Sequence, residues 1–215
     1  MAKQVEKAVE STKSSSTAVA VPGNPWSQLA HELEKVIGVQ IVKFTKQGEY
    51  AISETDLIPE GTRVVARVDL AQTGWVKWVD GAKVDTAMGA VADKFVPPAR
   101  TSLDDADRSS WEDPDRDPWQ FNMEMPVTRL DTDETFKFTT GSKGGMNALG
   151  KLIRVFGTRL EKGQTGLPIC VLKAGSYKHH EYGKIFYPVF EIVNWTDDGG
   201  KPMPVDKDLN DSIPF

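Results

Sequence analysis

Residues 141–156, GSKGGMNALGKLIRVF, decide the fold, because they carry the clearest helical pattern in a chain that otherwise reads as strands. The apolar side chains that share one stripe at helical spacing are Met146, Leu149, Ile153 and Phe156. Ser142 stands where a helix N-cap is expected, and Lys151 and Arg154 lie off the centre of the stripe. The pattern predicts an amphipathic helix that packs on a sheet.

Strand patterns surround this helix on both sides. Before it, period-two or apolar runs occupy residues 39–44, 48–52, 63–70, 74–79, 118–127 and 134–140. After it, two further strands are predicted at 167–173 and 184–195, joined by a basic, aromatic connection over 174–183. Asp80-Gly81 predicts a turn after the fourth run. The chain is therefore predicted to be mainly β with one or two helices, the second helix over residues 24–37.

This order of several strands, one helix and a final strand pair resembles the OB-fold, a five-stranded barrel with a helix after its third strand. The resemblance implies an OB-fold-like barrel over residues 24–195. A long acidic loop insertion at 93–118 and extra N-terminal strands depart from that pattern. Residues 1–23 are predicted to be a disordered arm, and residues 196–215 a disordered acidic tail.

Charge is segregated along the chain, although the net charge of its 215 residues is only −5. Residues 101–120 hold seven acids against two arginines, and residues 196–215 hold five acids against two lysines. Residues 141–190, in contrast, hold eight basic residues against two acids. Such segregation is typical of a polyanion binder with acidic appendages.

The location of the protein is predicted from what the sequence lacks. No run of apolar residues is long enough to cross a membrane, and the first residues show no secretion signal. The single cysteine, Cys170, lies in an apolar run and is expected to be buried. These features predict a cytoplasmic protein without membrane contact.

The sharpest motif is the end of the chain, DKDLNDSIPF at 206–215. It resembles the acidic tip of bacterial single-stranded DNA-binding proteins, which ends in Ile-Pro-Phe. The resemblance implies that the tip recruits replication or recombination proteins, and Ser212 departs from it where the family has an acid. The residues it assigns to partner binding are Asp206, Asp208, Asp211, Ile213, Pro214 and Phe215.

The body of the chain carries a second, fainter resemblance. Residues 117–120, DPWQ, and residues 138–145, FTTGSKGG, are similar to segments of phage-encoded proteins. This likeness implies a viral context, with the host cytoplasm as the location, and no particular activity.

Binding of single strands without sequence readout needs cations along a groove and exposed rings for base stacking. Three regions offer such groups: the predicted strands at 63–79, the helix, and the connection between the last two strands. Alternation places the two tryptophans of the first region on opposite strand faces, so one of them is expected in the core. The candidate DNA-binding residues are Arg63, Arg67, Trp75, Lys77, Trp78, Lys143, Lys151, Arg154, Tyr177, Lys178, His179, His180, Tyr182 and Lys184.

Enzyme motifs are not found. Neighbouring His179 and His180 have no cysteine or third histidine at metal-ligand spacing. The acids of 104–117 lack the pattern of a calcium loop, and the sequence contains no nucleotide-binding or hydrolase signature. We expect no catalytic residue, no metal and no cofactor.

The sequence therefore predicts a sequence-independent single-stranded DNA-binding protein that acts in phage DNA replication or recombination and is a possible homo-oligomer. Two alternatives stay open. One is an interaction protein or decoy that uses the tip to bind host repair enzymes without binding DNA. The other is a metal-dependent nuclease built on the acidic loop.

Overall fold

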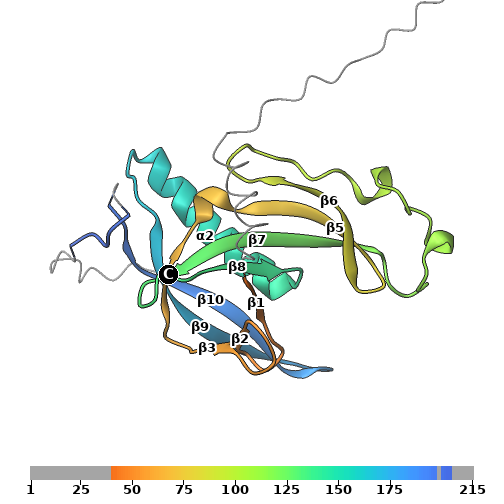
Figure 1. Ribbon diagram of the computed structural model, residues 1–215, viewed down its shortest axis with the longest axis horizontal. Helices are drawn as coiled ribbons and strands as arrows, with labels where there is room; N and C mark the ends of the chain where they lie inside the picture. The colour runs from red at the N-terminus through yellow and green to blue at the C-terminus, as the bar shows by residue number, and fades with distance from the viewer. Residues whose placement is uncertain (1–39, 198–199, 205–215) are drawn as a thin grey trace, which may run out of the picture.

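The computed structural model describes residues 40–197 and 200–204, which form a mainly β architecture with one α-helix among them (Figure 1). The strands curl into a mixed sheet with the shape of a half-barrel. Its strands are β1 (Gln40–Phe44), β2 (Tyr50–Ala51), β3 (Leu57–Ile58), β4 (Arg63–Ala66), β5 (Gln72–Val79), β6 (Ala82–Ala90), β7 (Trp119–Arg129), β8 (Thr135–Thr140), β9 (Pro168–His179) and β10 (Gly183–Trp195). The helices are α2 (Lys143–Glu161) and the short 3₁₀ turns η1 (Val68–Leu70), η2 (Arg100–Ser102) and η3 (Arg108–Ser110).

The long strand β7 organises the sheet, whose strand order is β10-β9-β4-β7-β8-β1-β2-β3. It pairs with β4 and β5 along one edge and with β8 along the other. β1 runs parallel to β8, whereas the other pairs are antiparallel. The hairpin β5–β6 branches from this path, and the predicted turn closes it, with Asp80 and Gly81 at φ values of 50° and 75°.

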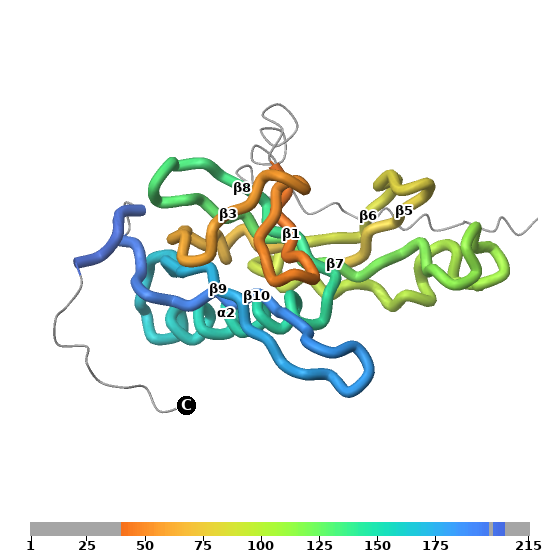
Figure 2. The backbone as a smooth tube through the Cα atoms, turned by 90° about the horizontal axis from the view of Figure 1, so that it is seen from below, coloured from red at the N-terminus to blue at the C-terminus, as the bar shows by residue number. Residues whose placement is uncertain are grey.

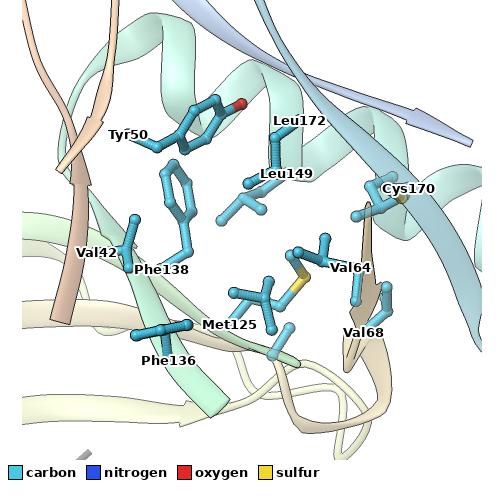
Figure 3. Close-up of a cluster of buried hydrophobic side chains, with 14 of the residues drawn as sticks. Val42, Tyr50, Val64, Val68, Met125, Phe136, Phe138, Leu149, Cys170 and Leu172 are labelled. Carbon is cyan, nitrogen blue, oxygen red and sulfur yellow. The ribbon is translucent and has the colours of Figure 1, made fainter. Parts of the chain in front are cut away.

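The core lies between the sheet and the apolar stripe of α2. Figure 3 shows side chains from the strands, η1 and the helix pointing toward one another, among them Val64, Met125, Phe138 and Leu149. Cys170 is buried there, as predicted, and burial raises the pKa of its thiol to about 12. The thiol is therefore protonated and unreactive at neutral pH.

Tyr50 connects this core to the last two strands. Its hydroxyl lies 3.1 Å from the carbonyl oxygen of Lys173 on β9 and 3.2 Å from that of Val189 on β10, and it accepts the N–H of Val189 at 3.2 Å. Burial raises the pKa of this hydroxyl, so it stays a neutral donor. One side chain from β2 thereby contacts β9 and β10 at Lys173 and Val189, which are register partners near the middle of the two strands.

The strand predicted over residues 63–70 is shorter in the structure. β4 ends at Ala66, and the chain turns through η1 after the N–H of Arg67 bonds to the carbonyl oxygen of Pro126 at 2.9 Å. Val64, Ala66 and Val68 are all buried nevertheless. Val65, which alternates with them, is buried as well, so β4 is covered on both faces.

The predicted helix is confirmed as α2, with Ser142 as its N-cap. The Ser142 hydroxyl accepts the N–H of Gly145 at 3.1 Å. A Cβ atom at Gly145 would lie 2.0 Å from Thr140 Oγ1, so only glycine lets the first turn approach the end of β8 this closely. Leu149 and Leu152 are buried, while Lys151 and Arg154 are exposed.

The predicted connection over 174–183 is a continuation of the two strands. Backbone pairing runs out to His179 and Gly183, so only residues 180–182 form the turn. β4 pairs with β9 only at 169–171, and the outer half of the hairpin therefore projects from the sheet as a two-stranded ribbon (Figure 2). We call residues 173–189 the ribbon.

Several predicted segments fall outside the described residues: the arm over 1–23, the helix over 24–37 and the acidic tip over 206–215. The start of the predicted tail is described and packs on the body, because Thr196 pairs with Pro202 and the N–H of Met203 bonds to Trp195 at 2.8 Å. No helix in the described ranges is long and apolar enough to span a bilayer.

Candidate functional site

A groove of about 670 Å³ lies between α2 and β10, the strand at the open edge of the sheet. Its polar lining consists of Lys143, Asn147, Lys151, Arg154, Tyr177 and Tyr187. Apolar side chains that include Leu152, Phe190 and Ile192 complete its lining. The groove thus joins an apolar interior to a basic and aromatic rim.

The helix presents its polar groups in one row. Lys143, Asn147, Lys151 and Arg154 are separated by four, four and three residues, which places them on one face of a helix. The row extends for about 16 Å at the rise of an α-helix. It could therefore contact several consecutive groups of an extended ligand.

The ribbon contributes two tyrosines to the groove, and a glycine makes room for one of them. Gly175 is the register partner of Tyr187, and a Cβ atom there would lie 2.3 Å from the Tyr187 ring, so the ring lies across the glycine. The ring of Tyr177 follows at a centroid distance of 6.3 Å, tilted by 40°, and its side chain is 51% exposed. Tyr177 therefore has ring surface available for a ligand in the groove.

No described carboxylate compensates the charges of the groove. Within the described part of the chain, Lys143, Lys151 and Arg154 form no ion pair. The groove therefore combines net positive charge with an apolar floor, a combination that favours an anionic ligand with flat apolar parts.

The tip of the ribbon holds a second group of predicted residues. The ring of His179 lies 4.5 Å from that of His180 and 4.9 Å from that of Tyr182, each at 30°. His179 Nδ1 accepts the backbone N–H groups of Glu181 and Tyr182 at 3.2 and 3.4 Å. The three rings therefore form a stack that the turn itself fixes in place.

Lys178 and Lys184 flank this tip. They are register partners on the ribbon and both are exposed. Lys184 Nζ lies 4.5 Å from the centroid of the Phe186 ring, a cation–π contact. The ribbon therefore adds two cations beyond the end of the groove.

The strand candidates Trp75, Lys77 and Trp78 lie in a different environment. Lys77 Nζ is 2.6 Å from a carboxylate oxygen of Asp104 and 2.6 Å from one of Asp105. These hydrogen bonds raise the pKa of Lys77. The charge of Lys77 is thus compensated twice, which leaves little of it for a phosphate.

The two tryptophans are also engaged. Trp75 donates its indole N–H to the carbonyl oxygen of Pro98 at 2.9 Å and meets Phe121 edge to face at 5.3 Å. Trp78 lines a separate hollow of about 300 Å³ together with Trp111, Asp113 and other acidic residues. Neither tryptophan lies beside the basic groove.

Residues 93–118, which we call the acidic arm, are more ordered than the predicted surface loop. They contain η2 and η3, and Arg100 makes a two-pronged contact with Asp117 at 2.8 and 2.8 Å. Burial alone would raise the pKa of Asp117, but the bonds from Arg100 and from the Trp119 N–H outweigh it and lower the pKa. No group of three or more His, Cys, Asp or Glu in the described ranges is placed to share a metal ion.

Arg63 and Arg67, which the sequence predicted in one strand over 63–70, lie in different elements of the structure. Arg63 is exposed on β4, whereas Arg67 lies beyond the end of that strand and pairs with Asp69 at 2.8 Å. The reason is the turn through η1, which takes Arg67 out of the strand. Neither residue lines the groove.

Two groove residues were missed from the sequence. Asn147 stands one turn from both Lys143 and Lys151, so the helical spacing alone would have identified it. Tyr187 was not among the candidate DNA-binding residues, and only the register of the ribbon, which pairs it with Gly175, shows that it borders the groove.

The structure therefore brings Lys143, Lys151, Arg154 and Tyr177 together in one groove and sets the tip residues on the ribbon that borders it. Comparisons with models of protein families, with curated proteins and with solved structures found no match to this chain.

Proposed function

We propose that the protein binds single-stranded DNA without sequence preference, with the strand lying in the groove between α2 and β10. The observation that carries this proposal is the row of cations on α2, which form no ion pair with described residues and face two tyrosines across an apolar floor. Proteins that bind single strands generally use this combination, in which cations follow the phosphates and rings stack on the bases.

The roles of the groove residues follow from their chemistry. Lys143, Lys151 and Arg154 would contact successive phosphates, because they lie in one row and form no ion pair with described residues. Tyr177 would stack on a base. Lysine and arginine side chains and ring faces do not distinguish bases strongly in this arrangement, which supports binding without sequence readout.

An OB-fold-like barrel remains part of this proposal. It is supported by the position of α2, which joins β8 to the final hairpin β9–β10. The parallel pair β1–β8 and the branching hairpin β5–β6 are additions to a simple five-stranded barrel.

A peptide is the competing ligand for this groove, since an open strand edge beside an apolar floor favours addition of another strand. Pro188 argues against it. Val189 directs its N–H and carbonyl toward Tyr50 and β9, so the backbone of Pro188 faces the open edge, where proline offers no donor. Strand addition would therefore lack a hydrogen bond in the middle of β10.

The proposal also includes the acidic tip at 206–215, which would recruit replication or recombination proteins of a phage-infected cell. Its aspartates and Ile213-Pro214-Phe215 are suited to a basic pocket with an apolar floor. Deletion of the tip is expected to abolish partner capture and to leave or raise affinity for single strands.

A titration of the full chain with an unstructured oligonucleotide at several salt concentrations tests the proposal. Fluorescence anisotropy of the labelled oligonucleotide should report binding, with log K falling against log salt at a slope of about −2 or steeper. That value follows from three phosphate contacts at about 0.7 each for single strands. Binding that is absent, or that does not respond to salt, would overturn the proposal.

A further inference from the structure

We propose that the tip of the ribbon recognises the junction where a single strand joins a duplex, by stacking its ring cluster on the terminal base pair. This inference rests on the proposed function and names the form of DNA that the site would prefer. The observations behind it are the projection of the ribbon, the fixed ring stack at its end and the two lysines beside that stack.

The ribbon is a long hairpin, and no third described strand pairs with its outer part. Twelve residues of β9 pair with β10, but β4 supports β9 only through Ile169, Cys170 and Val171. An isolated two-stranded ribbon has little stability of its own in water. The Tyr50 bond at its base and the Tyr187 ring over Gly175 stabilise the part nearest the sheet.

The rings at the tip are arranged in advance of any ligand. His180 and Tyr182 lie against the central ring of His179, which two backbone N–H groups hold in position. Tyr182 is 74% exposed, the largest exposed fraction among the tyrosines of the described chain. A fixed, exposed ring loses little conformational entropy when a base stacks on it.

The position of the tip selects a junction over a uniform single strand. Tyr177 lines the groove and lies two residues before His179, so both side chains project from the same face of β9. A strand that leaves the groove past Tyr177 therefore reaches the ring stack. If its next bases are paired, the stack meets the flat end of a duplex, which is wider than a single base.

Lys178 and Lys184, the two lysines next to the tip, lie on the opposite face of the ribbon. They alternate with the groove-lining Tyr177 and with its register partner Ile185, so their side chains project away from the bound strand. This placement suits the phosphates of the complementary strand, which diverges at the junction. Glu181 is the single acid within the ribbon and stands in the turn.

The experiment compares three DNAs at one salt concentration: a 15-nucleotide single strand, the same strand continued into a duplex, and the blunt duplex alone. The full chain should bind the junction about tenfold more tightly than the single strand, which corresponds to about 1.4 kcal/mol. A fluorescent base analogue in the terminal pair should be quenched on binding.

The double variant His180→Ala with Tyr182→Ala should lose that preference and the quenching, so that it binds the junction and the single strand with equal affinity. Glu181→Ala is the matched control in the same turn, and it should keep the preference. Thermal unfolding of each variant should match the parent, because the tip lies outside the core.

The outcomes separate this inference from the proposed function. Equal affinity for junction and single strand would overturn the inference and leave single-strand binding intact. A preference that persists in the double variant would also overturn it, because the junction would then be recognised elsewhere. Failure to bind any of the three DNAs would instead refute the proposed function.

Discussion

The groove and the acidic arm contain the same kinds of side chain and differ in what surrounds them. Both regions combine cations with aromatic rings: Lys151 and Tyr177 in the groove, Lys77 and Trp78 beside the arm. In the arm, two aspartates lie 2.6 Å from the ammonium group of Lys77. In the groove, the cations form no ion pair with described residues. A basic side chain is available to a ligand only where the fold brings no carboxylate to it.

The largest expected effect comes from reversing charge in the groove. Lys151→Glu with Arg154→Glu should weaken binding of a single strand by about 100-fold at low salt, because two phosphate contacts become repulsions. Fluorescence anisotropy with a labelled oligonucleotide measures this change.

The matched control alters the other region by the same net charge. Lys83→Glu with Lys94→Glu changes one exposed lysine on β6 and one exposed lysine within the arm, and affinity should fall less than threefold. Equal losses in both double variants would show that net charge alone governs binding, and the contrast between the two regions would disappear.

A smaller effect is expected from removing rings. Tyr177→Ala should weaken binding about tenfold, toward the lower end of the 1–3 kcal/mol range measured for a stacked base, and Tyr177→Phe should restore it. Trp78→Ala, at the hollow beside the arm, should leave affinity nearly unchanged. The reverse ranking, measured in the same titration, would move the binding site to the arm.

The smallest effect on DNA affinity is expected from loosening the arm itself. Lys77→Met removes both bonds to Asp104 and Asp105, so the arm should become more mobile while affinity stays within twofold. Faster cleavage of residues 93–118 by a protease at neutral pH, with an unchanged Kd, would sharpen the contrast between the two regions.

Acid should reproduce the loosening of the arm. Hydrogen bonds from Lys77 and from the Trp119 indole N–H hold the pKa of Asp104 below its ordinary value of 3.8. A carboxyl group with a lowered pKa stabilises the folded arm above its ordinary pKa and loses that effect as the pH falls through the lowered value. Tryptophan fluorescence should therefore be constant from pH 7 to about 5 and should change below about 4. The transition should be smaller in the parallel titration of Lys77→Met, because Asp104 then keeps only the bond from the Trp119 indole N–H.

The sequence predicted the local features of the fold well. The helix over α2, its cap at Ser142, the turn at Asp80-Gly81 and the buried Cys170 all depend on neighbouring residues or on short-range periodicity. The end of β4 and the length of the ribbon were predicted wrongly. Both depend on backbone partners far along the chain, such as Pro126 for Arg67.

The candidate site was predictable only where its residues belong to one local element. Lys143, Lys151 and Arg154 lie on one helix face, so their common position followed from the spacing of a single element. The compensation of Lys77 by Asp104 could not be foreseen, because the two residues are 27 positions apart and lie in different elements. Contacts at such separations depend on the whole topology.

The contacts of the Tyr50 hydroxyl affect the order in which parts of the chain fold. It joins residues 123 and 139 positions away, and those two contacts fix the strand that forms one side of the groove. Contacts at such separation close late, because a long loop must first lose its conformational entropy. A nascent chain would therefore complete the groove only after β10 has been synthesised and docked, so the proposed binding of DNA would be confined to chains that have reached that point.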